Sequence, residues 1–328
     1  MPWPAKATEM TVPPPVTPPP VTPITLVGIG KIARDQHLPA IAASRDFRLV
    51  AAVSRNETVP GVANFTDFDR FLAEGPAGAV SLCTPPAVRT AMALKAIAAG
   101  RDLMIEKPPA ATLGEIETII SAARAAGTAL FATWHSRHAA AVAPARDWLA
   151  GRRIDRVAIT WREDVRRWHP GQDWIWQPGG FGVFDPGINA LSVLTEILPG
   201  PIHVDAARLE VPANAATPIG VTLDMTARGS VPVSADFDWR QQGPQTWDIL
   251  IETEGRRLVL GQGGAAMTLD GAAVPVTPTD GEYPALYRRF AQIIATRAID
   301  ADTAPLRICA DACLRGRQVT TDPFHDRA

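Results

Sequence analysis

The chain has 328 residues, of which 46% are hydrophobic, and its formal net charge is −2. This length allows two domains with sizeable cores, and the near-neutral charge excludes the strongly basic surface on which nucleic-acid binding depends. Three cysteines are too few for a disulfide framework, which is typical of a reducing compartment, so we expect a cytoplasmic protein.

Residues 1–23 form a proline-rich segment that contains nine prolines and no continuous apolar run. The segment therefore matches neither a secretory signal nor a membrane span, and we expect no membrane partner. A polyproline II or disordered arm is expected instead. It could embrace another subunit, be a dispensable extension, or be partly mis-assigned coding sequence.

Residues 24–143 are expected to form the first domain, because short apolar strands alternate with helical stretches there. The expected strands are 24–28, 47–53, 78–83, 102–105 and 128–132, and the expected helices are 31–44, 87–99 and 112–126. This alternation indicates βαβ units and hence a doubly wound parallel sheet of the Rossmann type.

A glycine-rich turn joins the first expected strand to the first helix. Its pattern is Gly28-x-Gly30-x-x-Ala33, and Lys31 and Ile32 lie within it. The first glycine allows a tight turn, and the second lets a pyrophosphate approach the backbone at the helix N-terminus. We therefore predict a dinucleotide site that includes both glycines, Lys31 and Ile32.

The end of the second strand decides which dinucleotide is preferred. Sites for NAD place an acidic residue there, whereas this chain has Ser54 and Arg55, two donors suited to a 2′-phosphate. We predict that NADP is preferred and that NAD is also used, because Glu57 could reach a 2′-hydroxyl. The alternative is that Arg55 is only a solvated loop charge.

Two further strand ends complete the expected crevice. Thr84 and Pro85 follow the third strand and should pass near the nicotinamide ribose, while Glu106 and Lys107 follow the fourth strand and precede two prolines. Ligands bind beyond the carboxyl ends of such strands, so a lysine fixed there is presented to a ligand. We predict that Glu106 and Lys107 contact the cofactor. The alternative is a surface loop whose prolines merely end the strand.

Residues 144–328 show a different pattern, with strand-like runs that follow one another after short turns. The expected strands are 154–161, 203–211, 221–227, 231–239, 245–252 and 256–260, and the expected helices are 145–150, 186–198, 282–297 and 306–315. This order predicts an α+β domain on a mainly antiparallel sheet. A sheet face without helices commonly forms an interface, so we expect a homo-oligomer, either a dimer or a tetramer.

A candidate chemical site lies at the start of one of these helices. Asp185 precedes Pro186, and Asn189 follows one helical turn later on the same face. The acid and the amide would therefore point together toward a ligand. The alternative is structural, because Asp185 is a natural N-cap and Pro186 a natural first helical residue.

The loop before this helix contains four of the nine tryptophans, close to Glu163 and Asp164. Tryptophans bury much area, so packing at a domain junction is one interpretation. Flat aromatic faces beside carboxylates also suit a sugar, and Trp247 could form a further wall. No metal is expected, since the Cys309/Cys313 and His135/His138 pairs lack further ligands.

Together the glycine turn, the Glu106-Lys107-Pro108 strand end and the Gly-Gly-x-x-x-x-Asp185-x-x-x-Asn189 segment resemble the Gfo/Idh/MocA oxidoreductase family. Segments 133–137, 161–176 and 183–189 are similar to its bacterial L-arabinose/D-galactose 1-dehydrogenases, which oxidise the anomeric hydroxyl of a pyranose to a lactone with NAD(P). The resemblance implies a small-molecule sugar substrate. It implies catalytic roles for Lys107, Asp185 and Asn189, and sugar contacts for His135, Glu163, Trp168 and Trp247.

One departure from the family affects the mechanism. Inositol-type members have histidine at the position of Asn189, and asparagine cannot serve as a base at neutral pH. The base is then Asp185 or a deprotonated Lys107. We expect Asp185 to accept the C1 hydroxyl proton, Lys107 to polarise that oxygen and Asn189 to orient the sugar, with no histidine sharing proton transfer.

Three alternatives remain open at this point. The enzyme could act on another aldose or polyol, such as glucose, xylose or inositol, although the replacement of histidine argues against the inositol type. The chain could also be a catalytically silent NADP-binding sensor. L-Arabinose and D-galactose agree in their ring hydroxyls from C1 to C4, so the sequence does not separate them.

Overall fold

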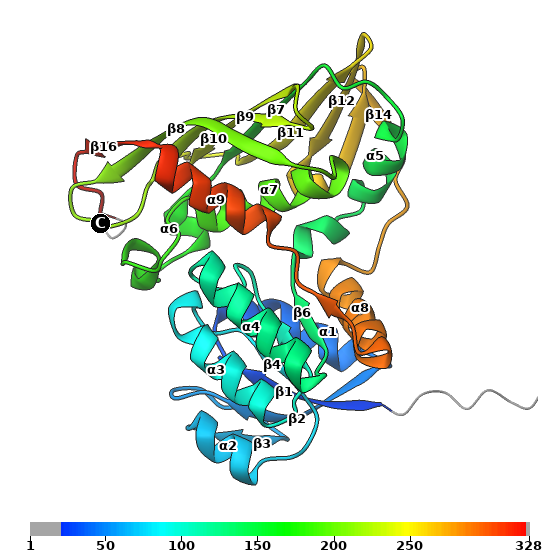
Figure 1. The fold of residues 1–328 in the computed structure, drawn as a ribbon, viewed down its shortest axis with the longest axis vertical. Helices are drawn as coiled ribbons and strands as arrows, with labels where there is room; N and C mark the ends of the chain where they lie inside the picture. Colours follow the sequence, from blue (N-terminus) through cyan, green and yellow to red (C-terminus); the bar gives the residue numbers. More distant parts are fainter. Residues whose placement is uncertain (1–20, 326–328) are drawn as a thin grey trace, which may run out of the picture.

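The computed structural model describes residues 21–325, so most of the proline-rich segment lies outside the described residues. Two sheets organise the described chain, one above the other in Figure 1. The first strand begins at Thr22, two residues earlier than expected. Within residues 21–325 there is no helix with the length and apolar character that a bilayer crossing requires.

The first sheet has seven strands, all parallel. In spatial order they are β15 (Ile299–Asp300), β6 (Leu130–Ala132), β5 (Leu103–Ile105), β4 (Ala79–Leu82), β1 (Thr22–Val27), β2 (Phe47–Val53) and β3 (Ala63–Phe65). Strand order reverses beside β1, which is the switch point of a doubly wound sheet and the place where such folds bind ligands. The predicted Rossmann fold is therefore confirmed.

Helices cover both faces of this sheet (Figure 1). They are α1 (Leu38–Ala43) with the π-helical turn η1 (Ala33–His37) before it, α2 (Phe68–Glu74), α3 (Pro86–Ala98), α4 (Leu113–Ala126) and α8 (Glu282–Thr296). Helix α3 packs on α4, and α1 packs on α8. Thr112 and Glu115 form a capping box at the start of α4, and Gly127 ends that helix with φ 65°.

Two elements from the C-terminal half complete the first sheet. Helix α8 buries Tyr287 and Phe290 against Phe47 and Phe131, and β15 pairs with β6. The sequence pattern predicted the helix over 282–297 as part of the unit formed by residues 144–328, and it did not predict β15. Only tertiary packing joins α8 and β15 to the first sheet. A two-residue strand such as β15 has no periodicity that the sequence could reveal. Strand β3 and helix α2 were also not predicted.

The second sheet has nine strands and is mainly antiparallel, as predicted. In spatial order they are β14 (Ala272–Val274), β13 (Ala266–Leu269), β12 (Arg256–Gly261), β11 (Thr246–Thr253), β7 (Arg156–Arg162), β10 (Val231–Asp238), β9 (Gly220–Ala227), β8 (Ile202–Pro212) and β16 (Arg317–Thr321). Two of the pairs are parallel, β7 with β10 and β8 with β16.

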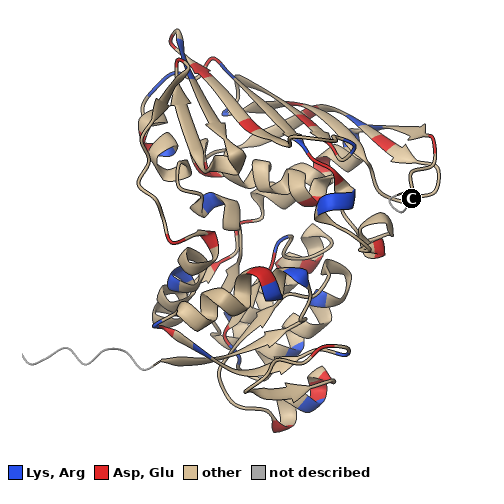
Figure 2. Cartoon of the chain, turned by 180° about the vertical axis from the view of Figure 1, so that it is seen from behind, with Lys and Arg blue, Asp and Glu red and all other residues tan. Residues whose placement is uncertain are grey.

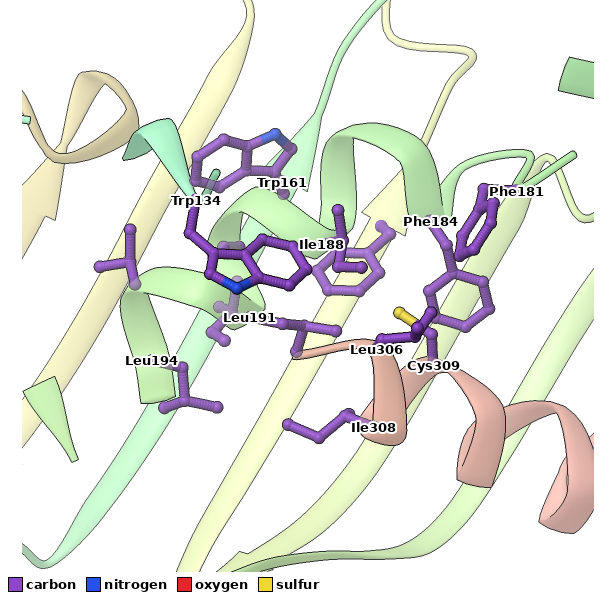
Figure 3. Close-up of a cluster of buried hydrophobic side chains, with 14 of the residues drawn as sticks. Trp134, Trp161, Phe181, Phe184, Ile188, Leu191, Leu194, Leu306, Ile308 and Cys309 are labelled. Atoms are coloured by element: carbon purple, nitrogen blue, oxygen red, sulfur yellow. The ribbon is translucent and has the colours of Figure 1, made fainter. Parts of the chain in front are cut away.

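Helices cover one face of the second sheet, and none of the described residues forms a helix on the other face (Figure 1). They are η2 (His135–His138), α5 (Val142–Leu149), α6 (Val165–Trp168), η3 (Asp173–Trp176), α7 (Phe184–Ile197), η4 (Gln262–Gly264) and α9 (Ala304–Arg315). Helix α7 lies between the sheet and α9, and Figure 3 shows its apolar side chains meeting those of α9. This packing fixes the N-terminus of α7 above the first domain.

Gly187 explains how α7 approaches the sheet so closely. A Cβ atom at this position would lie 2.7 Å from Cδ2 of Phe237, a buried side chain of β10. Only glycine leaves room for the phenyl ring there. The start of α7, including Asp185, is therefore held against a rigid sheet. Charges of both signs are interspersed over both units (Figure 2).

Candidate active site

The side chains of Lys107 and Asp185 meet between the two units. Nζ of Lys107 donates hydrogen bonds to the backbone oxygen of Asp185 at 2.9 Å and to its Oδ1 at 3.2 Å. The lysine follows β5 in the first sheet, and the aspartate lies in the first turn of α7. Their side chains are 14% and 7% exposed, so the pair is largely screened from water.

Asp185 does not cap its helix, contrary to the alternative that the sequence left open. Helix α7 begins at Phe184 after Val183, and no side chain caps it. Asp185 is the second helical residue, and its carboxylate faces Lys107 instead of the helix backbone. A cap therefore does not account for the aspartate.

Asn189 lies one turn after Asp185 and is partly buried. Its backbone oxygen accepts a hydrogen bond from Ser192 at 2.7 Å. Among the described residues its side-chain amide has no hydrogen-bond partner. The amide is therefore available to a ligand on the same side of α7 as Asp185.

His169 joins this group from the loop after α6. Its Nε2 lies 3.7 Å from Asp185 Oδ2 and 3.7 Å from Glu163 Oε1. The expectation that no histidine stands near the base is therefore wrong. The sequence held one signal for it, because His169 directly follows Trp168, which the resemblance had already assigned to the sugar.

Glu163 is a buried carboxylate held by two indole groups. Trp239 Nε1 donates to its Oε1 at 3.3 Å, and Trp247 Nε1 donates to its Oε2 at 3.0 Å. Burial disfavours the ionised form and raises the pKa of Glu163 to about 7, although the two indole hydrogen bonds oppose this shift. Glu163 therefore titrates near neutral pH.

Burial also disfavours the charged forms of Asp185 and His169. It would raise the pKa of Asp185, but the charge of Lys107 and the neighbouring His169 outweigh it and lower that pKa below its ordinary value. Burial also lowers the pKa of His169, and Lys107 adds to this effect while Asp185 opposes it. At neutral pH the aspartate is ionised and the imidazole is neutral.

Trp168 and Trp247 form an aromatic corner beside Glu163. Their rings meet edge to face with centroids 5.3 Å apart, and Gln245 accepts a hydrogen bond from Trp168 Nε1 at 3.3 Å. A cavity of about 330 Å³ opens here. It is lined by Arg167, Trp168, Gln245, Trp247, Asp248 and Gln262. Its size and its mixed aromatic and polar lining suit a small polar ligand.

His135 is placed differently from the other sugar-binding candidates. Its Nδ1 is bound to Oε2 of Glu282, and its ring stacks on Tyr283 with centroids 5.6 Å apart. Among the described residues, no hydrogen bond links it to Lys107, Asp185 or Glu163. The structure therefore ties His135 to α8.

Glu106 forms a buried network beneath the lysine. Its Oε1 accepts hydrogen bonds from Tyr283 OH at 3.0 Å and faces His37 Nε2 at 3.1 Å, and its Oε2 accepts from the backbone N–H of Lys107 at 2.9 Å. Burial opposes ionisation, but His37 lowers the pKa of Glu106 to about 2. Glu106 thus anchors the Lys107 backbone, and its predicted contact with the cofactor stays a prediction.

The glycine turn has the shape that a dinucleotide needs. Gly28 has φ 89°, and a Cβ there would lie 3.0 Å from Cys83 and Thr84, so only glycine fits. Above Gly30 no atom lies within 4 Å of a Cβ position, which leaves the start of the following helix open to a pyrophosphate. Lys31 pairs with Asp35, and Ile32 is 36% exposed at the same turn.

Ser54 and Arg55 lie at the end of β2, as predicted, and Arg55 is exposed. Among the described residues Arg55 has no ion-pair partner. Glu57 instead pairs with Arg34 at 3.2 Å. The guanidinium of Arg55 is therefore free for an anion, while Glu57 is already engaged.

Arg89 connects the two remaining strand ends and was not predicted. It lies on α3, is 2% exposed, and donates to the backbone oxygens of Thr84, Glu106 and Pro108. Thr84 and Pro85 are thus tied to the segment that carries Lys107. A buried arginine bonded to backbone carbonyls gave no recognisable motif in the sequence.

Comparisons with known proteins show the family and the fold of the chain. A model of the oxidoreductase family with an NAD-binding Rossmann fold matches residues 23–133. The galactose 1-dehydrogenase of Pseudomonas fluorescens is 44% identical over 302 residues, which cover 92% of this chain and 98% of that enzyme. The crystal structure of a D-galactose 1-dehydrogenase from Rhizobium etli is 48% identical, with a TM-score of 0.88 over 93% of this chain and 98% of that one. A 3-ketoreductase from Actinomadura kijaniata, solved with NADP and TDP-benzene, shares the fold at 17% identity, with a TM-score of 0.80 over 92% of this chain and 100% of that one.

Proposed function

This chain belongs to the Gfo/Idh/MocA family of oxidoreductases, as its motifs predicted, and we propose that it oxidises the C1 hydroxyl of an aldopyranose to the lactone. The substrates that we propose are D-galactose and L-arabinose. Two relatives at 44% and 48% identity that are named as galactose 1-dehydrogenases support this choice. The aromatic corner beside Glu163 supports it as well, since a sugar has apolar C–H faces and a hydroxyl rim.

The contact between Lys107 and Asp185 carries the proposal. A lysine ammonium and an ionised carboxylate stand together at the carboxyl end of β5, beside the switch point of the dinucleotide sheet. Asp185 is the group that removes the proton from the C1 hydroxyl, and Lys107 stabilises negative charge on that oxygen. Asn189 orients the ring with its free amide. When bound, the nicotinamide accepts the hydride from C1.

The proposed cofactor is NADP, with NAD as a weaker substitute. The free guanidinium of Arg55 and the hydroxyl of Ser54 would hold the 2′-phosphate of NADP. Glu57, which could accept a 2′-hydroxyl of NAD, is paired with Arg34. Gly28, Gly30, Lys31 and Ile32 would surround the pyrophosphate. Thr84 and Pro85 would lie toward the nicotinamide ribose.

A panel of aldoses tests the proposed function. We expect NADPH formation, followed by its absorbance, with D-galactose and L-arabinose, and slower turnover with glucose, xylose and inositol. Asp185→Asn should lower kcat by about 100-fold or more, since a positioned general base contributes about that factor. Its unfolding midpoint should fall, because the largely buried ammonium of Lys107 loses its charged partner, so circular dichroism must show that the variant is folded at the assay temperature.

The outcomes separate the competing functions. Tight NADP binding without turnover of any aldose would instead identify a silent sensor. Faster turnover of another sugar or polyol would assign the same chemistry to a different substrate. If Asp185→Asn retained wild-type kcat, another group would be the base.

A further inference from the structure

Four side chains form a continuous line through the candidate site. Lys107 binds Oδ1 of Asp185, whereas His169 faces Oδ2 of the same carboxylate at 3.7 Å. The same ring nitrogen, Nε2, lies 3.7 Å from Oε1 of Glu163. The imidazole therefore bridges two carboxylates, one of them in direct contact with the lysine.

The other ring nitrogen shows which way a proton can move. Nδ1 of His169 lies 3.4 Å from Oε1 of Gln172, an acceptor, which favours the tautomer with its proton on Nδ1. Nε2 then carries the lone pair and faces Asp185 and Glu163. The ring also lies 5.2 Å from the ring of Trp239, which holds its plane.

Asp185 alone is a poor resting place for a proton. Its pKa lies below the ordinary value, so a proton taken from a hydroxyl would leave it readily at neutral pH. The neutral imidazole stands next in line, and Glu163, with a pKa of about 7, stands beyond it. The imidazole thus faces both a carboxylate that holds a proton weakly and a carboxylate that titrates near neutral pH.

We propose that His169 receives at Nε2 the proton that Asp185 removes from the sugar hydroxyl, and that Glu163 accepts it next. The proposal rests on the proposed function and adds a route for the proton. The O–H bond breaks and an N–H bond forms, and the O–H electron pair becomes the second bond between C1 and oxygen. The C1–H pair leaves as hydride, so NADP⁺ is the oxidant and no other is needed.

Charged and polar groups from several elements surround the imidazole. Lys107, at the end of β5, and Lys31, in the turn after β1, disfavour the imidazolium, whereas Asp185 of α7 and the hydrogen bond to Gln172 favour it. Glu163, at the end of β7, faces the same nitrogen. Proton uptake by His169 is therefore balanced by neighbours on both sides of the site.

The pH dependence of turnover tests this route in the full-length protein. Both acceptors must be unprotonated, so wild-type kcat should fall as the pH drops through about 7, where Glu163 takes up a proton, and fall further as His169 takes one up below that pH. His169→Gln keeps a polar side chain but cannot take up a proton. We expect kcat to fall by about 100-fold. The KM for NADP should stay within about twofold of wild type, because the cofactor contacts are untouched. The decline of kcat at acidic pH, which we call the acid limb, should disappear.

Chemical rescue separates proton uptake from a structural role. His169→Ala should regain activity with added imidazole or 4-methylimidazole, in proportion to the free-base concentration. The matched control is His203→Gln, an exposed histidine of β8, which should leave both kcat and the pH profile unchanged.

Each result decides between the ideas. A His169→Gln enzyme with the wild-type rate and acid limb would overturn the relay while leaving the proposed function standing. If kcat fell but the acid limb of the pH profile stayed and imidazole gave no rescue, His169 would be a packing residue. This result would also overturn the relay. Absence of turnover by the wild type with any aldose would reject the proposed function itself, and the relay with it.

Discussion

Arg55 and Glu57 stand two residues apart after β2, with opposite charges and different surroundings. Glu57 is engaged by Arg34, whereas Arg55 is exposed and unpaired among the described residues. A surface charge without a partner contributes little to folding. Its place at the strand end that selects the dinucleotide supports the role proposed for it, as a ligand for a 2′-phosphate.

Replacing Arg55 by alanine tests this assignment. A hydrogen bond to a charged group contributes about 1.5–3 kcal/mol, so the KM for NADP should rise about 10-fold or more while that for NAD changes little. Initial rates with both cofactors measure the change. Arg48→Ala, an exposed arginine within β2, is the control and should alter neither value. An unchanged KM for NADP in Arg55→Ala would remove the arginine from the cofactor site.

At the level of single residues, local patterns predicted some site groups and not others. Lys107 and Asp185 follow recognisable strand-end and helix-start signals, and the structure brings them together. His169 lies in an irregular loop, and its approach to Asp185 depends on packing between distant segments. Glu106 belongs to a motif, yet its partners Tyr283 and His37 come from helices that only the folded chain brings together.

Helix α7 is the element that positions Asp185 and Asn189, and its position depends on Gly187. The glycine faces the Phe237 ring of β10, and a Cβ atom there would lie 2.7 Å from Cδ2 of that ring. Alanine favours a helix by up to about 1 kcal/mol over glycine. Overpacking in a rigid core costs about 1–3 kcal/mol, so the clash should prevail.

Gly187→Ala should therefore unfold more easily than the wild type, by about 1–2 kcal/mol in denaturant titrations. It should also lower kcat, because a shift of α7 separates Asp185 from Lys107. Gly114→Ala in the first turn of α4 is the matched control. No atom lies within 4 Å of its Cβ position, so that variant should be as stable as the wild type or slightly more stable. Equal destabilisation of both variants would show that contact with Phe237 is not the cause.

At the level of elements, predictions succeeded where periodicity extended over several residues. Strand β2 and helix α4 lie close to their predicted bounds. Strand β15 has two residues and no readable pattern, and its pairing with β6 depends on α8 packing under the sheet. The parallel pairing of β7 with β10 was equally unreadable, since short turns between neighbouring segments only indicate antiparallel pairs.

At the scale of the whole molecule, residues 21–325 place no helix on one broad face of the second sheet (Figure 1). The side chain of Leu250 in β11 lies on this face, whereas those of its buried neighbours Ile249 and Ile251 point to the other face. Leu250 pairs with Ala158 of β7 on one side and with Val259 of β12 on the other. These side chains are only partly buried in the single chain. We infer that a second copy covers this apolar strip, because a bare sheet face of this kind commonly forms a two-fold interface.

Leu250→Arg tests the interface, because it would place a guanidinium in the middle of that strip. Light scattering coupled to size exclusion should give the wild type at least twice the 35.0 kDa mass of the chain, and the variant should shift toward a single chain. Leu314→Arg is the matched control. That leucine is 84% exposed on α9, so its replacement should leave the mass unchanged. A wild type that elutes as one chain would contradict the interface. An oligomer that survives Leu250→Arg would place the subunit contact on another face, since a buried unpaired charge destabilises an interface strongly.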